Sequence, residues 1–146
     1  MRDPAAQVKP RPPWTRGVLA VLLAVGAFGA VTLLALEGKE VVQLRTTAQD
    51  GTTRSTRTWI ADADGAMWIE AANPERPFLR DLEARPEAVL LRGGQARPVR
   101  AVALPGERGH QKIRRLLAGK YGWADVWVGL LTDTSRSVAV RLDPAP

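Results

Sequence analysis

The chain contains no cysteine and only one histidine, His110, among its 146 residues. The absence of cysteine excludes disulfides, thiolate chemistry and Cys-ligated metals. A zinc or two-metal centre needs several converging ligands, and one histidine among scattered carboxylates does not supply them. His110 stands where a helix is expected to begin, which favours a solvated or capping role for it.

Several catalytic and nucleotide-binding motifs are also missing. The sequence has no GxSxG nucleophile motif, no phosphate-binding P-loop and no GxGxxG dinucleotide fingerprint. Hydrolysis by the chain's own side chains is therefore not expected. Any chemistry would have to be supplied by a group that the protein binds.

The excess of positive charge is modest once the N-terminal segment is set aside. The whole chain has a formal net charge of +6, whereas residues 37–146 carry 17 Lys or Arg against 14 Asp or Glu, a difference of +3. This bias favours anionic ligands or anionic lipid headgroups. Nucleic acid is not expected as a partner, because the chain lacks a dense basic stripe with interleaved aromatic residues.

A run of 20 residues, Gly17 to Leu36, carries no charge. A helix of about 20 residues spans the roughly 30 Å hydrocarbon core of a bilayer. The run predicts a single-pass, N-terminal transmembrane helix at residues 17–36, after a basic, disordered tail at residues 1–16 and before a domain at residues 37–146. The alternatives are a cleaved signal peptide, whose apolar region is usually about 7–15 residues long, and a buried soluble helix.

The flanking charges do not decide which side of the membrane the domain occupies. Four Lys or Arg precede the run, and Lys39, Arg45 and Arg54 follow it. The positive-inside rule favours a cytoplasmic N-terminus by a single charge. A phosphorylated redox cofactor would instead favour a cytoplasmic domain, so the orientation stays open.

Short strands separated by glycine turns dominate residues 37–146. Strands are predicted at Glu40–Thr47, Thr53–Ala61, Ala66–Ala71, Glu87–Arg92, Ala96–Leu104 and Ser137–Leu142. Helical spacing predicts helices at Pro77–Arg85 and Gly109–Tyr121, while Gly122–Leu131 is helical or irregular. This pattern indicates a mainly β (α+β) fold, a closed or nearly closed antiparallel barrel. Pro98 indicates an edge position or a bulge in its strand.

The stretch from Arg54 to Leu91 has the features of an anion site. Two paired strands lead into a polar loop in which Arg76 stands between two prolines, and a short amphipathic helix follows. A fixed guanidinium group near a helix start suits a phosphate-bearing ligand.

The same stretch resembles a family of split β-barrel proteins that bind flavin or deazaflavin. Arg45-Thr-Thr47, followed by Gly51 to Arg54, resembles the Thr-rich turn with a glycine and a basic residue after the family's first strand. Arg57-Thr-Trp-Ile60 resembles the start of its second strand. Phe78 to Pro86 resembles its Pro-aromatic helix, although Phe78, Asp81 and Arg85 replace the Trp, Asn and Asn of that pattern.

The resemblance extends from Glu40 to Leu142 and includes the segments KYGWADVWVGLL and DTSRSVAVRL. The family is the FMN/F420-binding split β-barrel superfamily, which includes the pyridoxamine-phosphate-oxidase-like proteins. Within it the sequence is most similar to the deazaflavin (F420)-dependent nitroreductase family. The resemblance implies a split antiparallel β-barrel with two or three short helices, a homodimer, and a cofactor site near the dimer interface.

The resemblance also implies which residues would bind a cofactor. The expected cofactor-binding residues are Arg54, Arg57, Thr58, Trp59, Ile60, Ala71, Ala72, Asn73, Arg76 and Phe78. The three arginines would bind phosphate, because a planar guanidinium group gives two charge-assisted bonds to one phosphate. Thr58 to Ile60 would line the ring, and Ala71 to Asn73 are small enough for a ring or ribityl chain to approach the backbone. Asp81 would repel a phosphate.

Each of these residues has a plainer alternative. The arginines could be solvated surface residues, and Trp59 could be part of the core. The cluster Tyr121, Trp123 and Trp127 is open to three interpretations: a stacking wall over a ligand, an interfacial belt at lipid headgroups, and a core or dimer contact. No general acid stands out, and Tyr121 is the weak candidate for a catalytic residue.

The sequence therefore predicts a membrane-anchored, nitroreductase-like oxidoreductase. It would transfer a hydride between bound F420, or alternatively FMN, and a small organic substrate such as a nitroaromatic, quinone or enone. The bound cofactor would carry the chemistry, and the protein would orient it. The alternatives are a non-catalytic tethered barrel that binds a flavin or tetrapyrrole-like ligand, and a structural envelope protein.

Overall fold

The computed structural model describes residues 13–145, and the chain divides into two units, Met1–Leu34 and Ala35–Pro146. Helix α1 (Pro13–Leu36) contains an apolar segment, Arg16–Leu36, with a mean hydropathy of 2.6. Its 21 residues are long and apolar enough to cross a membrane. The predicted tail at residues 1–16 falls mainly outside the described residues, and residues 13–16 form the first turn of α1.

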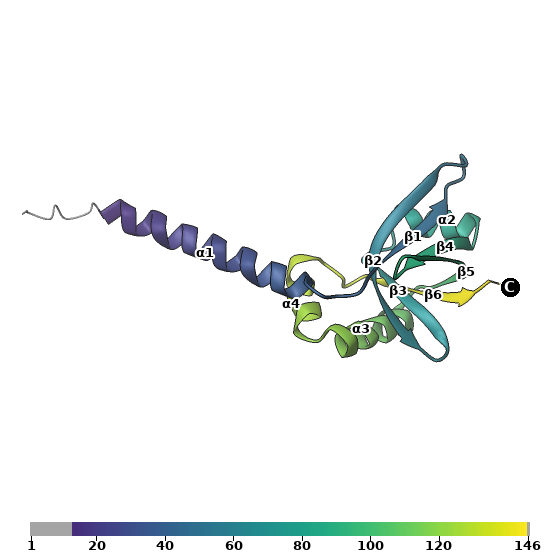
Figure 1. The fold of residues 1–146 in the computed structure, drawn as a ribbon. Helices are drawn as coiled ribbons and strands as arrows, with labels where there is room; N and C mark the ends of the chain where they lie inside the picture. Colours follow the sequence, from purple (N-terminus) through teal and green to yellow (C-terminus); the bar gives the residue numbers. More distant parts are fainter. Residues whose placement is uncertain (1–12, 146) are drawn as a thin grey trace, which may run out of the picture. The chain divides into compact units, whose positions relative to one another are not determined.

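The second unit is built on six antiparallel strands (Figure 1). They are β1 (Val41–Thr47), β2 (Thr53–Ala63), β3 (Ala66–Ala71), β4 (Glu87–Arg92), β5 (Gln95–Leu104) and β6 (Val138–Pro144). Their order around the barrel is β1-β2-β3-β6-β5-β4, and β4 closes the ring by pairing with β1. The predicted fold class, an antiparallel barrel with short helices after an apolar helix, is confirmed.

Three helices accompany the barrel: α2 (Pro77–Ala84), α3 (Glu107–Tyr121) and α4 (Trp123–Leu131). The segment that the sequence left as helical or irregular is thus the helix α4. Gly122 separates α3 from α4 with a φ of 57°, a left-handed conformation that glycine adopts without steric cost. Its N–H donates to the carbonyl of Ala118 and ends α3.

The core has two parts because the sheet carries apolar groups on both faces. The barrel interior contains residues from all six strands and is covered at one end by Phe78, Leu79 and Leu82 of α2. On the outside, Ile113 and Leu117 of α3 pack against β2, β3 and β6. Each fully buried Leu or Ile contributes about 1.5–3 kcal/mol relative to an exposed position.

The expected edge position holds at Pro98 itself but not for β5 as a whole, since β5 pairs with β4 at Gln95–Arg100 and with β6 only from Val99 onward. Pro98 lies one residue before Val99, which pairs with Pro144 near the end of β6. Its carbonyl accepts a hydrogen bond from Ala145 N at 3.1 Å. The missing N–H therefore falls at the rim of the barrel, where it interrupts little of the sheet.

An ion-pair network joins the start of β1 to β2, β4 and α3. Arg92 of β4 bridges Glu40 and Asp62, with N–O distances of 2.6 Å to both carboxylates. Lys120 of α3 donates to Glu40 and, at 2.7 Å, to the carbonyl of Ile60. The network fixes the chain at the point where it enters the barrel.

This network predicts a loss of stability in acid. Hydrogen bonds from Arg92, joined at Glu40 by Lys120, lower the pKa values of Glu40 and Asp62 below their ordinary values of 4.5 and 3.8. A carboxyl group with a lowered pKa stabilises the fold above its unfolded pKa, and this contribution disappears as the pH falls through the folded pKa. We expect the thermal midpoint to fall steadily below about pH 5.

The matched variant is Glu40→Gln combined with Asp62→Asn. It should unfold at a lower temperature than the parent protein at neutral pH and show a flatter decline towards acid, as measured by tryptophan fluorescence. A decline equally steep in parent and variant would show that other carboxylates cause the acid sensitivity.

Candidate functional site

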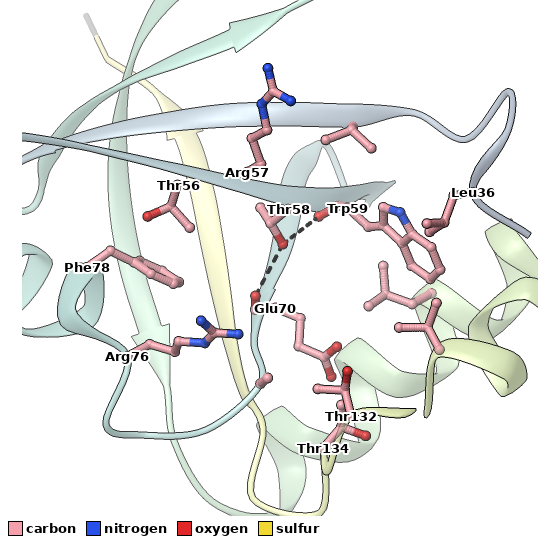
Figure 2. Close-up of a pocket in the computed structure, with 14 residues that line it drawn as sticks. Leu36, Thr56, Arg57, Thr58, Trp59, Glu70, Arg76, Phe78, Thr132 and Thr134 are labelled. Atoms are coloured by element: carbon pink, nitrogen blue, oxygen red, sulfur yellow. Dashed lines mark hydrogen bonds between the residues drawn. The ribbon is translucent and has the colours of Figure 1, made fainter. Parts of the chain in front are cut away.

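A cavity of about 320 Å³ lies beside β2 (Figure 2). Its lining comes from the strands β1 to β3, the loop into α2, the helices α3 and α4, and the segment that follows α4. The lining residues are Leu36, Val41, Thr56, Arg57, Thr58, Trp59, Glu70, Ala72, Arg76, Phe78, Leu117, Val128, Thr132 and Thr134. All of them belong to the unit Ala35–Pro146, which includes the last two residues of α1.

The two ends of the cavity differ in chemistry. Figure 2 shows Arg76 and Phe78 at one end and Trp59 and Leu36 at the other. Arg57 rises from β2, and its guanidinium group points away from the other labelled side chains. The cavity therefore has one cationic end and one apolar, aromatic end.

Both arginines are available to an external anion. Six other arginines of the described chain form ion pairs, whereas neither Arg57 nor Arg76 has a carboxylate partner among residues 13–145. Both side chains are exposed. A phosphate or carboxylate could accept charge-assisted hydrogen bonds there without displacing an existing ion pair.

A half-buried acid, Glu70, also lines the cavity. The Glu70 side chain is 12% exposed, and both of its carboxylate oxygens accept hydrogen bonds from Arg114 Nη1, at 3.1 and 3.2 Å. Arg114 also pairs with Asp125 of α4. Burial opposes the guanidinium charge, but attraction to Glu70 and Asp125 outweighs it and raises the pKa of Arg114. The negative charge of Glu70 is therefore neutralised by the protein itself.

The ring of Trp59 is supported from behind by Tyr121. Their ring centroids lie 4.4 Å apart, with 23° between the planes. The Tyr121 hydroxyl accepts the N–H of Ile60 at 3.1 Å and donates to the carbonyls of Glu40 and Ile60 at 2.8 and 2.9 Å. Burial raises its pKa. Tyr121 therefore holds Trp59 in place, and its own proton is engaged by the backbone.

Six of the ten residues expected to bind a cofactor line this cavity: Arg57, Thr58, Trp59, Ala72, Arg76 and Phe78. The hydroxyl of Thr58 donates to the carbonyl of Glu70 at 3.3 Å and joins β2 to β3 at the cavity wall. Phe78 is 2% exposed and contributes to the barrel core as well as to the cavity. Tyr121, the weak catalytic candidate, lies outside the lining.

The other four expected residues lie elsewhere. Ile60 and Ala71 face the barrel interior, because successive side chains of a strand alternate between the two faces of the sheet. Asn73 lies in the loop before α2, where its carbonyl accepts the N–H of Arg76 at 3.4 Å. Arg54 is paired with Asp81 at 2.9 Å.

Asp81 does not line the cavity, so it does not oppose a phosphate there. Its Oδ2 accepts hydrogen bonds from Thr46 Oγ1 at 2.7 Å and from Arg54 Nε at 2.9 Å. Thr46 and Asp81 are 1% and 5% exposed. Through the buried carboxylate of Asp81, these hydrogen bonds join α2 to the β1–β2 hairpin.

Sequence reasoning did not identify Glu70 or the residues supplied by α4 and the following segment. One signal was present: Glu70 is the only charged residue in the apolar strand AMWIEA, and a charge in such a strand needs a partner. The contributions of Val128, Thr132 and Thr134 had no local signal, because they depend on how α4 packs.

His110 lies outside this cavity. Its Nδ1 is 2.9 Å from the Ser137 hydroxyl, a contact that joins the first turn of α3 to the residue before β6. Among residues 13–145, no group of three or more His, Asp or Glu side chains is placed to hold a metal ion.

Solved structures with the same fold include an F420 reductase, a pyridoxamine 5'-phosphate oxidase-like protein and a FAD-binding protein. An F420 reductase is 20% identical, with a TM-score of 0.53 over 78% of this chain and 93% of the other. A pyridoxamine 5'-phosphate oxidase-like protein from Listeria innocua is 14% identical, with a TM-score of 0.55 over 82% and 94% of the two chains. A FAD-binding protein from Mesorhizobium loti is 17% identical, with a TM-score of 0.52 over 82% and 88%.

At these identities the similarity demonstrates a shared fold. No family model matches the sequence, and no curated protein matches it. The expected resemblance to flavin- and deazaflavin-binding split barrels is thus confirmed at the level of three-dimensional structure.

Proposed function

We propose that this protein is a membrane-anchored oxidoreductase that binds F420, or alternatively FMN, in the cavity beside β2. The observation that carries the proposal is the presence of two arginines without carboxylate partners on the cavity lining. Arg76 lies at the end opposite Trp59, and Arg57 rises from β2 with its guanidinium group turned outward (Figure 2). A cofactor with a flat ring and an anionic tail would match such a cavity, with the ring at the apolar end and the tail at the cationic end. The fold is shared with solved proteins described as F420 reductases and as FAD-binding.

The residues of the cavity fit such a group. Arg76 and Arg57 would bind the anionic tail, with Arg76 the stronger contact because it points towards the cavity. The ring would lie along β2 between Thr58 and Trp59, where Ala72 leaves space next to the backbone. When bound, the cofactor would supply hydride transfer to or from a small organic substrate.

The chain's own residues would orient the cofactor and exclude water. Trp59, Leu36 and Val128 make the ring end of the cavity apolar. The Tyr121 hydroxyl is bound to backbone groups of β2 and to the Glu40 carbonyl, so the wall behind the ring is rigid. Glu70, paired with Arg114, would accept a hydrogen bond from a polar edge of the ring or the substrate without carrying an uncompensated charge.

The proposal includes the membrane anchor and the homodimer. The segment Arg16–Leu36 has the length and hydropathy of a single transmembrane helix. A homodimer is included because the sequence resembles a family of paired barrels. The side of the membrane stays open.

Replacing both arginines with alanine should abolish tight cofactor binding. Each lost charge-assisted contact corresponds to about 1.5–3 kcal/mol, or roughly a 10- to 150-fold rise in Kd. We expect Arg76→Ala to have the larger single effect and the double variant to bind at least about 100-fold more weakly. Quenching of cofactor fluorescence on titration with detergent-solubilised full-length protein measures the Kd for F420 and FMN.

The control is Arg97→Ala combined with Arg115→Ala. It removes the same charge from exposed arginines outside the cavity and should leave Kd within about twofold, since distant screened charges contribute little. Failure of the parent protein to bind F420 or FMN at tens of micromolar would contradict the proposed function. Binding that is equal in both double variants would contradict only the site.

The non-catalytic alternative is favoured by one observation, namely that the Tyr121 proton is engaged by backbone carbonyls. In that case the protein would bind the cofactor but would not accelerate the oxidation of the reduced cofactor by quinones or nitroaromatics. A turnover assay with bound, reduced F420 separates the two functions.

A further inference from the structure

Helix α4 exposes four of its apolar side chains and buries its charged side chain. Its exposed residues are Trp123, Val126, Leu130 and Leu131, with exposed fractions of 54%, 63%, 75% and 51%. Its one charged residue, Asp125, is 4% exposed. This arrangement is the reverse of a helix on the surface of a soluble protein.

The neighbouring helix shows the usual arrangement. Ile113 and Leu117 of α3 are buried, while Arg108 and Arg115 face the solvent. The two helices differ although only Gly122 separates them. The medium outside α4 is therefore expected to be apolar, whereas the medium outside α3 is water.

Specific contacts hold α4 in this orientation. Asp125 forms an ion pair with Arg114 of α3, and Arg114 also pairs with Glu70 of β3. Rotating α4 to bury its apolar face would break the ion pair between Asp125 and Arg114 and would leave Glu70 as the one carboxylate paired with this half-buried guanidinium group. The exposed apolar face is thus a fixed feature of the barrel unit.

The chain also limits how far the barrel lies from the end of the apolar helix. Helix α1 ends at Leu36, and β1 begins at Val41. Five residue steps span at most about 17 Å even when fully extended. Moreover, Leu36, Val41 and Val128 of α4 line the same cavity within the barrel unit. The segment that leaves the apolar helix and α4 are therefore close neighbours.

We propose that α4 lies on the surface of the bilayer that α1 crosses, with Trp123, Val126, Leu130 and Leu131 in the boundary between headgroups and acyl chains. Tryptophan favours this boundary, and an apolar helix face binds to it in proportion to the area it buries. The inference rests on the proposed anchoring by α1. It assigns the barrel a second contact with lipid and one fixed orientation relative to the membrane.

The absence of cysteine makes a direct test possible in the full-length protein. Single variants Val126→Cys and Leu130→Cys would be labelled with an environment-sensitive fluorophore and reconstituted into phosphatidylcholine–phosphatidylglycerol vesicles. Quenchers attached to lipid acyl chains report contact with lipid, and iodide reports contact with water. Glu83→Cys is the matched control, because Glu83 is an exposed residue of α2, which lies at the other end of the barrel unit from α4 (Figure 1).

We expect the labels at 126 and 130 to be quenched by the lipid-borne quencher at least about twofold and to be protected from iodide. The label at 83 should show the opposite pattern. The circular dichroism spectrum and the thermal midpoint of the unlabelled variants should match those of the parent, since both replaced residues on α4 are exposed.

Two results would overturn the inference while leaving the anchor intact. Iodide quenching at 126 and 130 as strong as at 83 would place α4 in water. Protection from both quenchers would place α4 against a second copy of the chain. A carbonate wash tests the anchor separately: release of the full-length protein from the vesicles would overturn the anchor and this inference with it.

Discussion

Gly109→Ala is expected to destabilise the barrel unit by about 3 kcal/mol or more, because no space exists for a side chain at this position. A Cβ built on Gly109 would overlap the carbonyl oxygen of Leu104 and would lie 2.9 Å from its carbonyl carbon. Both groups are backbone, so the first turn of α3 would have to move away from the end of β5. The thermal midpoint should fall by roughly 10–15 °C for a unit of this size.

Gly119 provides a control within the same helix. It is exposed, and no atom lies within 4 Å of a Cβ built on it. Gly119→Ala should therefore stabilise the unit by about 0.5–1 kcal/mol through helix propensity. Thermal unfolding in mild detergent, followed by tryptophan fluorescence, compares the two variants. Similar midpoints for them would contradict the close approach of α3 to β5.

Asp81→Ala is expected to cost about 3 kcal/mol, as it removes a carboxylate that accepts two buried or half-buried hydrogen bonds. The loss has two sources. The Arg54 side chain is 42% exposed and can turn to water, so the loss of its ion pair contributes little to the destabilisation. Thr46 is buried, and its hydroxyl would lose its acceptor in a place that water does not reach.

A double-mutant cycle with Thr46→Val separates these sources. In the parent protein Thr46→Val should be destabilising, because Asp81 then loses a donor. In the Asp81→Ala background it should be nearly neutral, because the valine no longer leaves a polar group unpaired. Urea unfolding in mild detergent measures all four proteins. Additive changes would show that Thr46 and Asp81 do not interact in solution.

Local turn chemistry allowed most strands to be predicted from the sequence. The Asp64-Gly65 and Gly93-Gly94 turns have positive φ at both residues, as the two-residue hairpin turns between twisted strands require. Their residue types identify them without any knowledge of the rest of the chain. The hairpins β2–β3 and β4–β5 follow directly.

Pairings between distant segments could not be predicted in the same way. The pairing of β1 with β4, and the position of β6 between β3 and β5, follow from the closed packing of the whole chain. The residues of the candidate site differ in the same way: some were predictable from local sequence, and others come together only through the packing of the whole chain. Arg57 and Arg76 could be identified from their local sequence, whereas the Glu70–Arg114–Asp125 cluster joins residues from three elements.

The position of β6 has a consequence for the order in which the protein folds. Ala71 of β3 pairs with Val138 of β6, 67 residues later in the chain, and β5 pairs with the other side of β6. During synthesis, the sheet therefore cannot become a ring until β6 has left the ribosome. The apolar helix α1 emerges long before that point. The membrane insertion proposed for α1 would therefore begin while the polypeptide that follows is still unfolded.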